Sequence, residues 1–166
     1  LLVVAVKERH PKELLKTAMS LLGTGQLSLT KVLILVGPDR NPGDFRTVLR
    51  DLWHRFDPED HMWLLPVAPL DTLDFTSFNM HVGSKLIMDA AGDNLNRAEP
   101  RRDLDPRAFD ARIEKYKLLD GGFLVIAVRE NGRDILEKLL TQHLGMRFIV
   151  AVSPDVRLED DENLQW

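Results

Sequence analysis

The sequence predicts an α/β fold, in which a mainly parallel or mixed sheet is flanked by helices. Two observations lead to this prediction. Short apolar runs rich in β-branched residues alternate with segments whose apolar residues recur at helical spacing, and part of this alternation occurs twice along the chain. The composition, 44% hydrophobic and 29% charged residues in 166, is typical of a globular protein and not of a disordered one.

Four apolar runs in the first half of the chain have the length expected of buried strands. They comprise residues 1–6, 32–36, 62–65 and 85–90. Two segments between them predict helices. Residues 11–22 carry leucines at helical spacing and stop at Gly23, and a second helix follows Asn41-Pro42-Gly43-Asp44 and ends at Asp57-Pro58. We expect Asn41 to cap this second helix and Pro42 to occupy its first turn.

The connections are less regular than these elements. Residues 66–83 form a stretch of 18 residues that is mostly uncharged and shows no clear period. Since an apolar loop is costly in water, we expect it to pack against its own domain, a ligand or a partner. Residues 93–110 are charged and contain Pro100, which predicts a surface linker, and a helix is expected near residues 106–118.

A βαβ unit is repeated along the chain. Residues 3–8 recur as 125–130 at an offset of 122, whereas residues 31–39 match 147–155 at an offset of 116, so that six residues are missing between the helix and the second strand of the second copy. Both copies have glycine after the helix and Pro-Asp after the second strand, which favours duplication over chance similarity. We therefore expect a domain over 1–92, a linker with a helix over 93–121 and a partial repeat over 122–166.

Composition excludes several classes of function. The chain has 22 Lys and Arg against 26 Asp and Glu, a net charge of −4, which argues against nucleic acid as a partner. With no Cys, it has neither disulfides nor thiolate sites. The apolar runs are too short for a transmembrane segment, and the start does not resemble a signal peptide. We expect an internal part of a cytoplasmic protein.

Motifs for catalysis or metal binding are largely missing. There is no phosphate-binding GxxxxGK[ST] loop, and the five His show no metal-binding spacing. Residues 23–31 form a glycine-rich connection that ends in Lys31, which is either a plain loop or an anion or cofactor contact. Lys85 and Asp89, four residues apart on one strand face, predict either a buried ion pair or the wall of a site, and the structural role is favoured.

These motifs, in order, resemble one family. The strand 31–39, Asn41-Pro42-Gly43-Asp44 and Arg55-Phe56-Asp57-Pro58 are followed by Pro69-Leu70-Asp71-Thr72-Leu73-Asp74-Phe75, then by Gly83-Ser84-Lys85 and Asp89-Ala90. Over residues 1–92 the chain resembles the C-terminal domain of UbiD-type decarboxylases, whose namesake is 3-octaprenyl-4-hydroxybenzoate carboxy-lyase of ubiquinone biosynthesis. It departs from the family pattern at Gly37-Pro38-Asp39, where an acidic run is usual, and residues 122–166 extend beyond the usual domain.

The resemblance implies that the parent protein is a non-oxidative decarboxylase of aromatic or α,β-unsaturated acids in quinone biosynthesis, with prenylated FMN, a divalent metal and potassium as cofactors. In the family, the catalytic Glu–Arg–Glu set lies in an N-terminal flavin-binding domain. We therefore expect neither catalytic nor metal-binding residues here, and none of these cofactors bound to this chain alone. The expected partners are that flavin-binding domain and further copies in a homo-oligomer. The residues expected to contact the flavin-binding domain or an interface are Gln26, Lys31, Ser84, Lys85 and Asp89.

Two other interpretations stay open. The chain could be a stand-alone α/β ligand-binding or protein-interaction module without catalytic activity, whose glycine-rich loop holds an anion. It could also be a regulatory domain built from tandem βαβ repeats. The coding sequence upstream of Leu1 distinguishes them, since only the decarboxylase interpretation requires a flavin-binding domain there.

Overall fold

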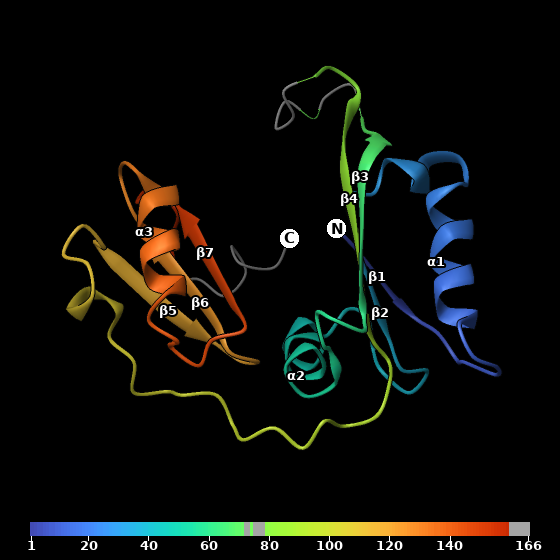
Figure 1. Ribbon diagram of the computed structural model, residues 1–166, viewed down its shortest axis with the longest axis horizontal. Coiled ribbons are helices and arrows are strands. Elements are labelled where there is room, and N and C mark those ends of the chain that lie inside the picture. The colour runs from blue at the N-terminus through green and yellow to red at the C-terminus, as the bar shows by residue number, and fades with distance from the viewer. Residues whose placement is uncertain (72–73, 75–78, 160–166) are drawn as a thin grey trace. The chain divides into compact units, whose positions relative to one another are not determined.

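A computed structural model of the chain describes residues 1–71, 74 and 79–159. The chain divides into two compact units, Leu1–Asn96 and Arg97–Trp166. Across the described residues each unit contains one mixed sheet with helices packed on it, which confirms the predicted α/β class (Figure 1). No helix in this part of the chain combines the length and hydropathy needed to span a bilayer.

The first unit contains a four-stranded sheet, as far as the described residues show, in the order β1-β2-β4-β3. Its strands are β1 (Leu2–Ala5), β2 (Val32–Val36), β3 (Met62–Pro69) and β4 (Val82–Ala90). Strand β2 pairs in parallel with β1 and β4, whereas β3 is antiparallel to β4. The sheet is mixed because β3 and β4 form one long hairpin.

Helices α1 (Glu13–Leu22) and α2 (Phe45–Arg55) cover opposite faces of this sheet (Figure 1). On the α1 side, the helix packs its apolar stripe against side chains of β2 and β4 in a core that contains Leu14, Ala18, Leu22, Leu33, Leu35 and Ile87. The α2 stripe, Val48, Leu49 and Leu52, is buried as well. These stripes are the helical periodicities seen in the sequence.

The cap of α2 differs from the prediction. Asp44, not Asn41, is the N-cap residue, and its side chain accepts a hydrogen bond from the Thr47 amide at 3.3 Å. The Asn41 side chain instead accepts from the Gly43 amide at 3.0 Å. Because this short Asx turn satisfies an amide two residues on, the chain around Pro42 and Gly43 turns before the helix begins.

The hairpin occupies most of the segment expected to be a loop. Strand β3 continues to Pro69 and β4 begins at Val82, with a register shift between Leu65 and Ala68. Proline in a strand is tolerated at an edge or a bulge, and β3 offers both among the described strands. The prediction of a loop over 66–83 was therefore wrong at both ends. Phe75 and Phe78, which it included, lie outside the described residues.

The second unit has strand order β5-β6-β7 in its described part, from strands β5 (Lys115–Leu119), β6 (Phe123–Ala127) and β7 (Phe148–Val152). Strand β6 is antiparallel to β5 and parallel to β7, and α3 (Gly132–Leu140) packs on the sheet. The helix expected near 106–118 was wrong. A 3-10 turn, Pro106–Ala108, is followed by β5, where Tyr116 and Leu118 alternate into the core with period two.

The strand registers agree with the sequence repeat. Leu2 pairs with Leu33, 31 residues later, whereas Phe123 pairs with Phe148, 25 residues later. The second copy is thus six residues shorter between its two parallel strands, as the offsets of 122 and 116 indicate. Both copies are parallel βαβ units.

Candidate functional site

Lys85 anchors the β3–β4 hairpin to the connection that follows α1. Its side chain is only 2% exposed. The ammonium donates to the carbonyl oxygens of Ser28 at 2.5 Å and Thr30 at 2.8 Å, next to the 3-10 turn η1 (Gly25–Leu29). Burial lowers the pKa of Lys85. The lysine thus satisfies two backbone carbonyls that the loop itself does not satisfy.

The ion pair considered between Lys85 and Asp89 is not formed. Both side chains are on the same face of β4, but four residues of strand span about 13 Å, which is too long for an ion pair. Within the described chain, the Lys85 ammonium is held by backbone carbonyls and the Asp89 carboxylate by the Ala91 amide. The even spacing predicted the shared face correctly and the pairing wrongly.

Lys31 forms a second link at the same end of the sheet. Its ammonium lies 2.8 Å from a carboxylate oxygen of Asp74, and both side chains are partly exposed. Gln26, on η1, and Ser84, on β4, are exposed. Four of the five predicted contact residues therefore belong to two segments that Lys85 and Lys31 hold together.

Apolar side chains are exposed on these two segments. We call them the hairpin-end surface: Leu27 (38% exposed), Leu29 (43%), Val67 (79%), Met80 (73%) and Val82 (39%). The first two belong to η1 and the others to the end of the β3–β4 hairpin where Ala68 pairs with Gly83 (Figure 1). Neighbouring exposed apolar residues are typical of a surface that another protein part covers.

Asp89 lies elsewhere, at the carboxyl end of β4. It is 9% exposed and its Oδ1 accepts from the Ala91 amide at 2.9 Å. Burial raises the pKa of Asp89, and Glu8 raises it further, whereas His61 and Lys12 act in the opposite direction. The five predicted residues are thus separated into two places at opposite ends of β4.

Asp89 lines a pocket of about 490 Å³, which we call the Asp89 pocket. The charged and aromatic groups around it come from the loop after β1 and from the start of β3, and include Arg9, His10, Lys12, His61 and Trp63. Ligands of open α/β sheets bind outside the carboxyl ends of parallel strands, as here. The sequence analysis missed these residues, although the position of the loop after a predicted parallel strand was a usable signal.

The loop beneath this pocket is fixed by Glu13. Its carboxylate accepts from the Arg9 amide at 2.7 Å and from the Arg9 guanidinium at 2.8 Å, and these bonds lower the pKa of Glu13. Lys12 has φ of 67°, and its ammonium lies 5.8 Å from the centre of the Trp63 ring. The pocket is therefore walled by a loop with a defined conformation.

The Arg-x-Asp-Pro element has a structural role. Asp51 on α2 is 4% exposed and accepts from Arg40 at 2.8 Å and from Arg55 at 3.1 Å. Arg55 also donates to the Gly92 carbonyl. The cluster ties α2 to the chain that follows β2 and β4.

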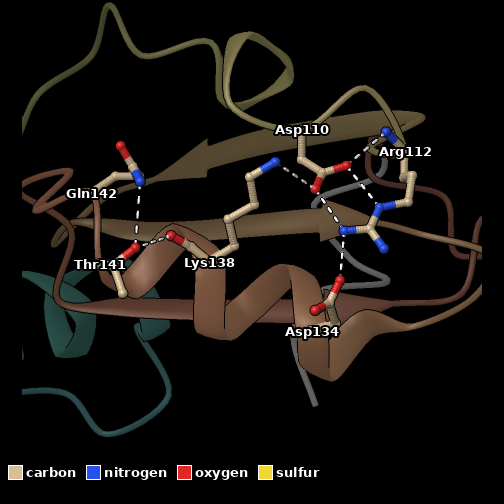
Figure 2. A network of polar contacts seen from close by, with 6 residues as sticks. All are labelled: Asp110, Arg112, Asp134, Lys138, Thr141 and Gln142. Carbon is tan, nitrogen blue, oxygen red and sulfur yellow. Dashed lines mark hydrogen bonds and ion pairs between the residues drawn. The ribbon is translucent and has the colours of Figure 1, made fainter.

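A second charged network stabilises the other unit (Figure 2). Asp110, 6% exposed, accepts from the Arg112 guanidinium at 2.7 Å and from the Lys138 ammonium at 3.2 Å. Arg112 also donates to Asp134 at 2.7 Å. Hydrogen bonds from Arg112 hold the pKa of Asp110 well below its usual range. The network joins the segment before β5 to α3. Across the residues described, no three His, Asp or Glu side chains are arranged to hold a metal ion.

Comparison with known proteins gives related sequences of greater length. An uncharacterized protein of Archaeoglobus fulgidus is 38% identical over 115 residues, which are 69% of this chain and 24% of that protein. A 4-hydroxybenzoate decarboxylase component of Chlamydia pneumoniae is 37% identical over 92 residues, 55% of this chain and 16% of that protein. The chain spans about a quarter or less of these relatives.

Solved structures share the fold. Vanillic acid decarboxylase of Sedimentibacter hydroxybenzoicus in its closed form matches with a TM-score of 0.53 at 20% identity, over 84% of this chain and 25% of that one. The UbiD-class enzyme HmfF from Pelotomaculum thermopropionicum, in complex with FMN, matches with a TM-score of 0.50 at 20% identity, over 62% and 22%.

A family model also matches more than half of the chain. Residues 1–90 match the 3-octaprenyl-4-hydroxybenzoate carboxy-lyase C-terminal domain. These residues include the β3–β4 hairpin with Lys85, the α2 cluster with Asp51 and the Asp89 end of β4. The chain therefore belongs to the UbiD family of carboxy-lyases, and its first 90 residues are the C-terminal domain of that family.

Proposed function

We propose that the chain is the assembly and site-closing part of a carboxy-lyase that depends on prenylated FMN and acts on aromatic or α,β-unsaturated acids, with a role in quinone biosynthesis in the cytoplasm. Two findings support the proposal: the match to the family's C-terminal domain and the small share of each relative that the chain spans. In this proposal the chain covers and positions a flavin site and does not carry out the chemistry itself.

The observation that carries the proposal is the hairpin-end surface. Its apolar side chains are exposed on segments that Lys85 and Lys31 hold in place, so they are presented by a rigid support. A preorganised apolar surface loses little conformational freedom on binding and is suited to a stable intramolecular interface. We assign this surface to the flavin-binding domain of the same protein, with Gln26, Lys31, Ser84 and Lys85 at or beneath the contact.

The cofactors belong, in this proposal, to the flavin-binding domain. Prenylated FMN with its divalent metal and potassium needs clustered oxygen ligands, and the described residues do not supply such a cluster. When bound, the cofactor would supply the electron sink for loss of CO2. Here the chain contributes the wall that closes over the site, and a homo-oligomer of the intact enzyme fits a domain with this role.

Two experiments test the assignment. The coding sequence upstream of Leu1 should encode a flavin-binding domain; a stop codon or an unrelated domain there would contradict the proposal. Separately expressed flavin-binding domain, mixed with this chain, should then form a complex detectable by native mass spectrometry. Bovine serum albumin in place of the flavin-binding domain is the control. Failure of the cognate pair to associate would leave the hairpin-end surface without its assigned partner.

A further inference from the structure

The Asp89 pocket has the position and size of a small-molecule site. It lies at the carboxyl ends of β1 and β4, between the loop that leads into α1 and the residues around Gly92. Its volume of about 490 Å³ is within the range of pockets that hold small ligands. The motifs that relate the chain to its family assign it no ligand.

The amino end of α1 supplies hydrogen-bond donors to this pocket. Lys12 is the N-cap residue of this ten-residue helix, and no side chain caps it. A lysine cannot do so because it has no acceptor atom. Leu14 and Leu15, the second and third residues of the helix, line the pocket. First-turn amides carry partial positive charge and favour an anion, as does the Lys12 ammonium.

Asp89 is an independent observation that points to a ligand. Its side chain is more than nine-tenths buried and lines the pocket. Oδ1 accepts from the Ala91 amide, whereas no described residue donates a hydrogen bond to Oδ2. An anionic ligand beside this carboxylate would be repelled unless one proton lies between them. A carboxylic acid provides that arrangement, since two carboxyl groups can share a single proton in a short hydrogen bond.

We propose that the Asp89 pocket binds a small carboxylate, with one ligand oxygen sharing a proton with Asp89 and the other accepting from the first-turn amides of α1. Lys12 provides the positive charge nearest the ligand, and Trp63 provides an apolar wall. The remaining groups that act on Asp89 are Glu8, which disfavours its negative charge, and His61, which favours it. The site goes beyond the proposed function because it needs no flavin and no contact at the hairpin-end surface.

The first experiment uses benzoate and inorganic phosphate as probes on the full chain. Benzoate should shift the amide resonances of Leu14 and Leu15 and the indole resonance of Trp63. Calorimetry in two buffers of different ionisation enthalpy should show uptake of a fraction of one proton on binding near pH 7. The absence of benzoate shifts at these groups, or equal binding of phosphate without proton uptake, would overturn the proposal.

Variants of the chain make the test specific. Asp89→Asn can still donate to the ligand through its amide, so it should bind benzoate without proton uptake and with little dependence on pH. Lys12→Ala should weaken binding about fivefold through loss of one charge-assisted contact. Lys16→Ala is the matched control on the same helix, outside this pocket, and should bind as the unmodified chain does. Unchanged proton uptake in Asp89→Asn would contradict the proposal, as would equal effects of the two lysine variants.

Discussion

Lys85 donates its ammonium to the Thr30 carbonyl at 2.8 Å, across 55 residues of sequence. A buried cation held by backbone carbonyls is unusual, because burial disfavours the charged form. Here it joins the connection after α1 to the long hairpin, and so determines the shape of the surface that those two segments expose.

Replacing Lys85 should therefore be costly. In Lys85→Ala, the carbonyls of Ser28 and Thr30 lose their donor, and we expect a loss of about 2 kcal/mol in the free energy of unfolding. Urea denaturation followed by circular dichroism measures it. Lys31→Ala is the control, since its ion pair with Asp74 is partly exposed and should cost about 0.5 kcal/mol. Equal stabilities of the two variants would show that Lys85 is not the anchor described.

Asp89→Asn should stabilise the chain at neutral pH. The pKa of Asp89 is raised by burial, so the folded state holds a proton that the unfolded state releases. Stability therefore falls as pH rises from the unfolded pKa to the folded one, and it stays lower at neutral pH. Asparagine removes this penalty and can still accept from the Ala91 amide. Thermal unfolding from pH 4 to 7 should show a higher Tm for the variant at pH 7; a lower one would contradict the burial argument.

Asp110→Asn should destabilise the second unit, with the opposite dependence on pH. Hydrogen bonds from Arg112 lower the pKa of Asp110, so its contribution is fully present above the unfolded pKa of about 3.9 and is lost as pH falls through the folded pKa. The variant should have a Tm several degrees lower at pH 7, and the difference should shrink in acid. Asp103→Asn is the control because its carboxylate is 80% exposed. A difference between Asp110→Asn and the unmodified chain that persists unchanged in strong acid would refute this account of Asp110.

Val67→Asp should separate binding from folding. Val67 is 79% exposed, so the free energy of unfolding should change by no more than about 0.5 kcal/mol. A charge within an apolar contact should nevertheless weaken association with the flavin-binding domain at least tenfold, which titration calorimetry measures. Leu140→Asp, at a position 65% exposed on α3, is the matched control and should bind normally. If both variants bind normally, the hairpin-end surface is not the interface.

Several elements could be predicted from the sequence because their signals are local. Strand β2 has the bounds of its apolar run, Val32–Val36, and Gly23 follows the last residue of α1 as expected of a helix end. The hairpin was harder, since Pro66 and Pro69 are typical of loops and are tolerated only because β3 is bulged and lies at the edge of the described sheet. In β5, the alternation of Tyr116 and Leu118 covers too few residues to outweigh the prolines before it.

The candidate sites depended on contacts that residue types do not encode. Backbone carbonyls hold Lys85, and every residue has one, so no residue type points to the Ser28 and Thr30 acceptors. Asp89 could be placed on the correct face from its spacing, but its pocket depends on how the loop after β1 turns at Lys12. The family motifs identified the chain before its contacts were known, because they combine many such positions.

The most direct test of the central claim is an assay of CO2 release with prenylated FMN and an aromatic acid substrate of the intact enzyme. The account predicts no turnover by this chain alone and turnover when the flavin-binding domain is present. Sustained CO2 release by the chain alone would contradict it.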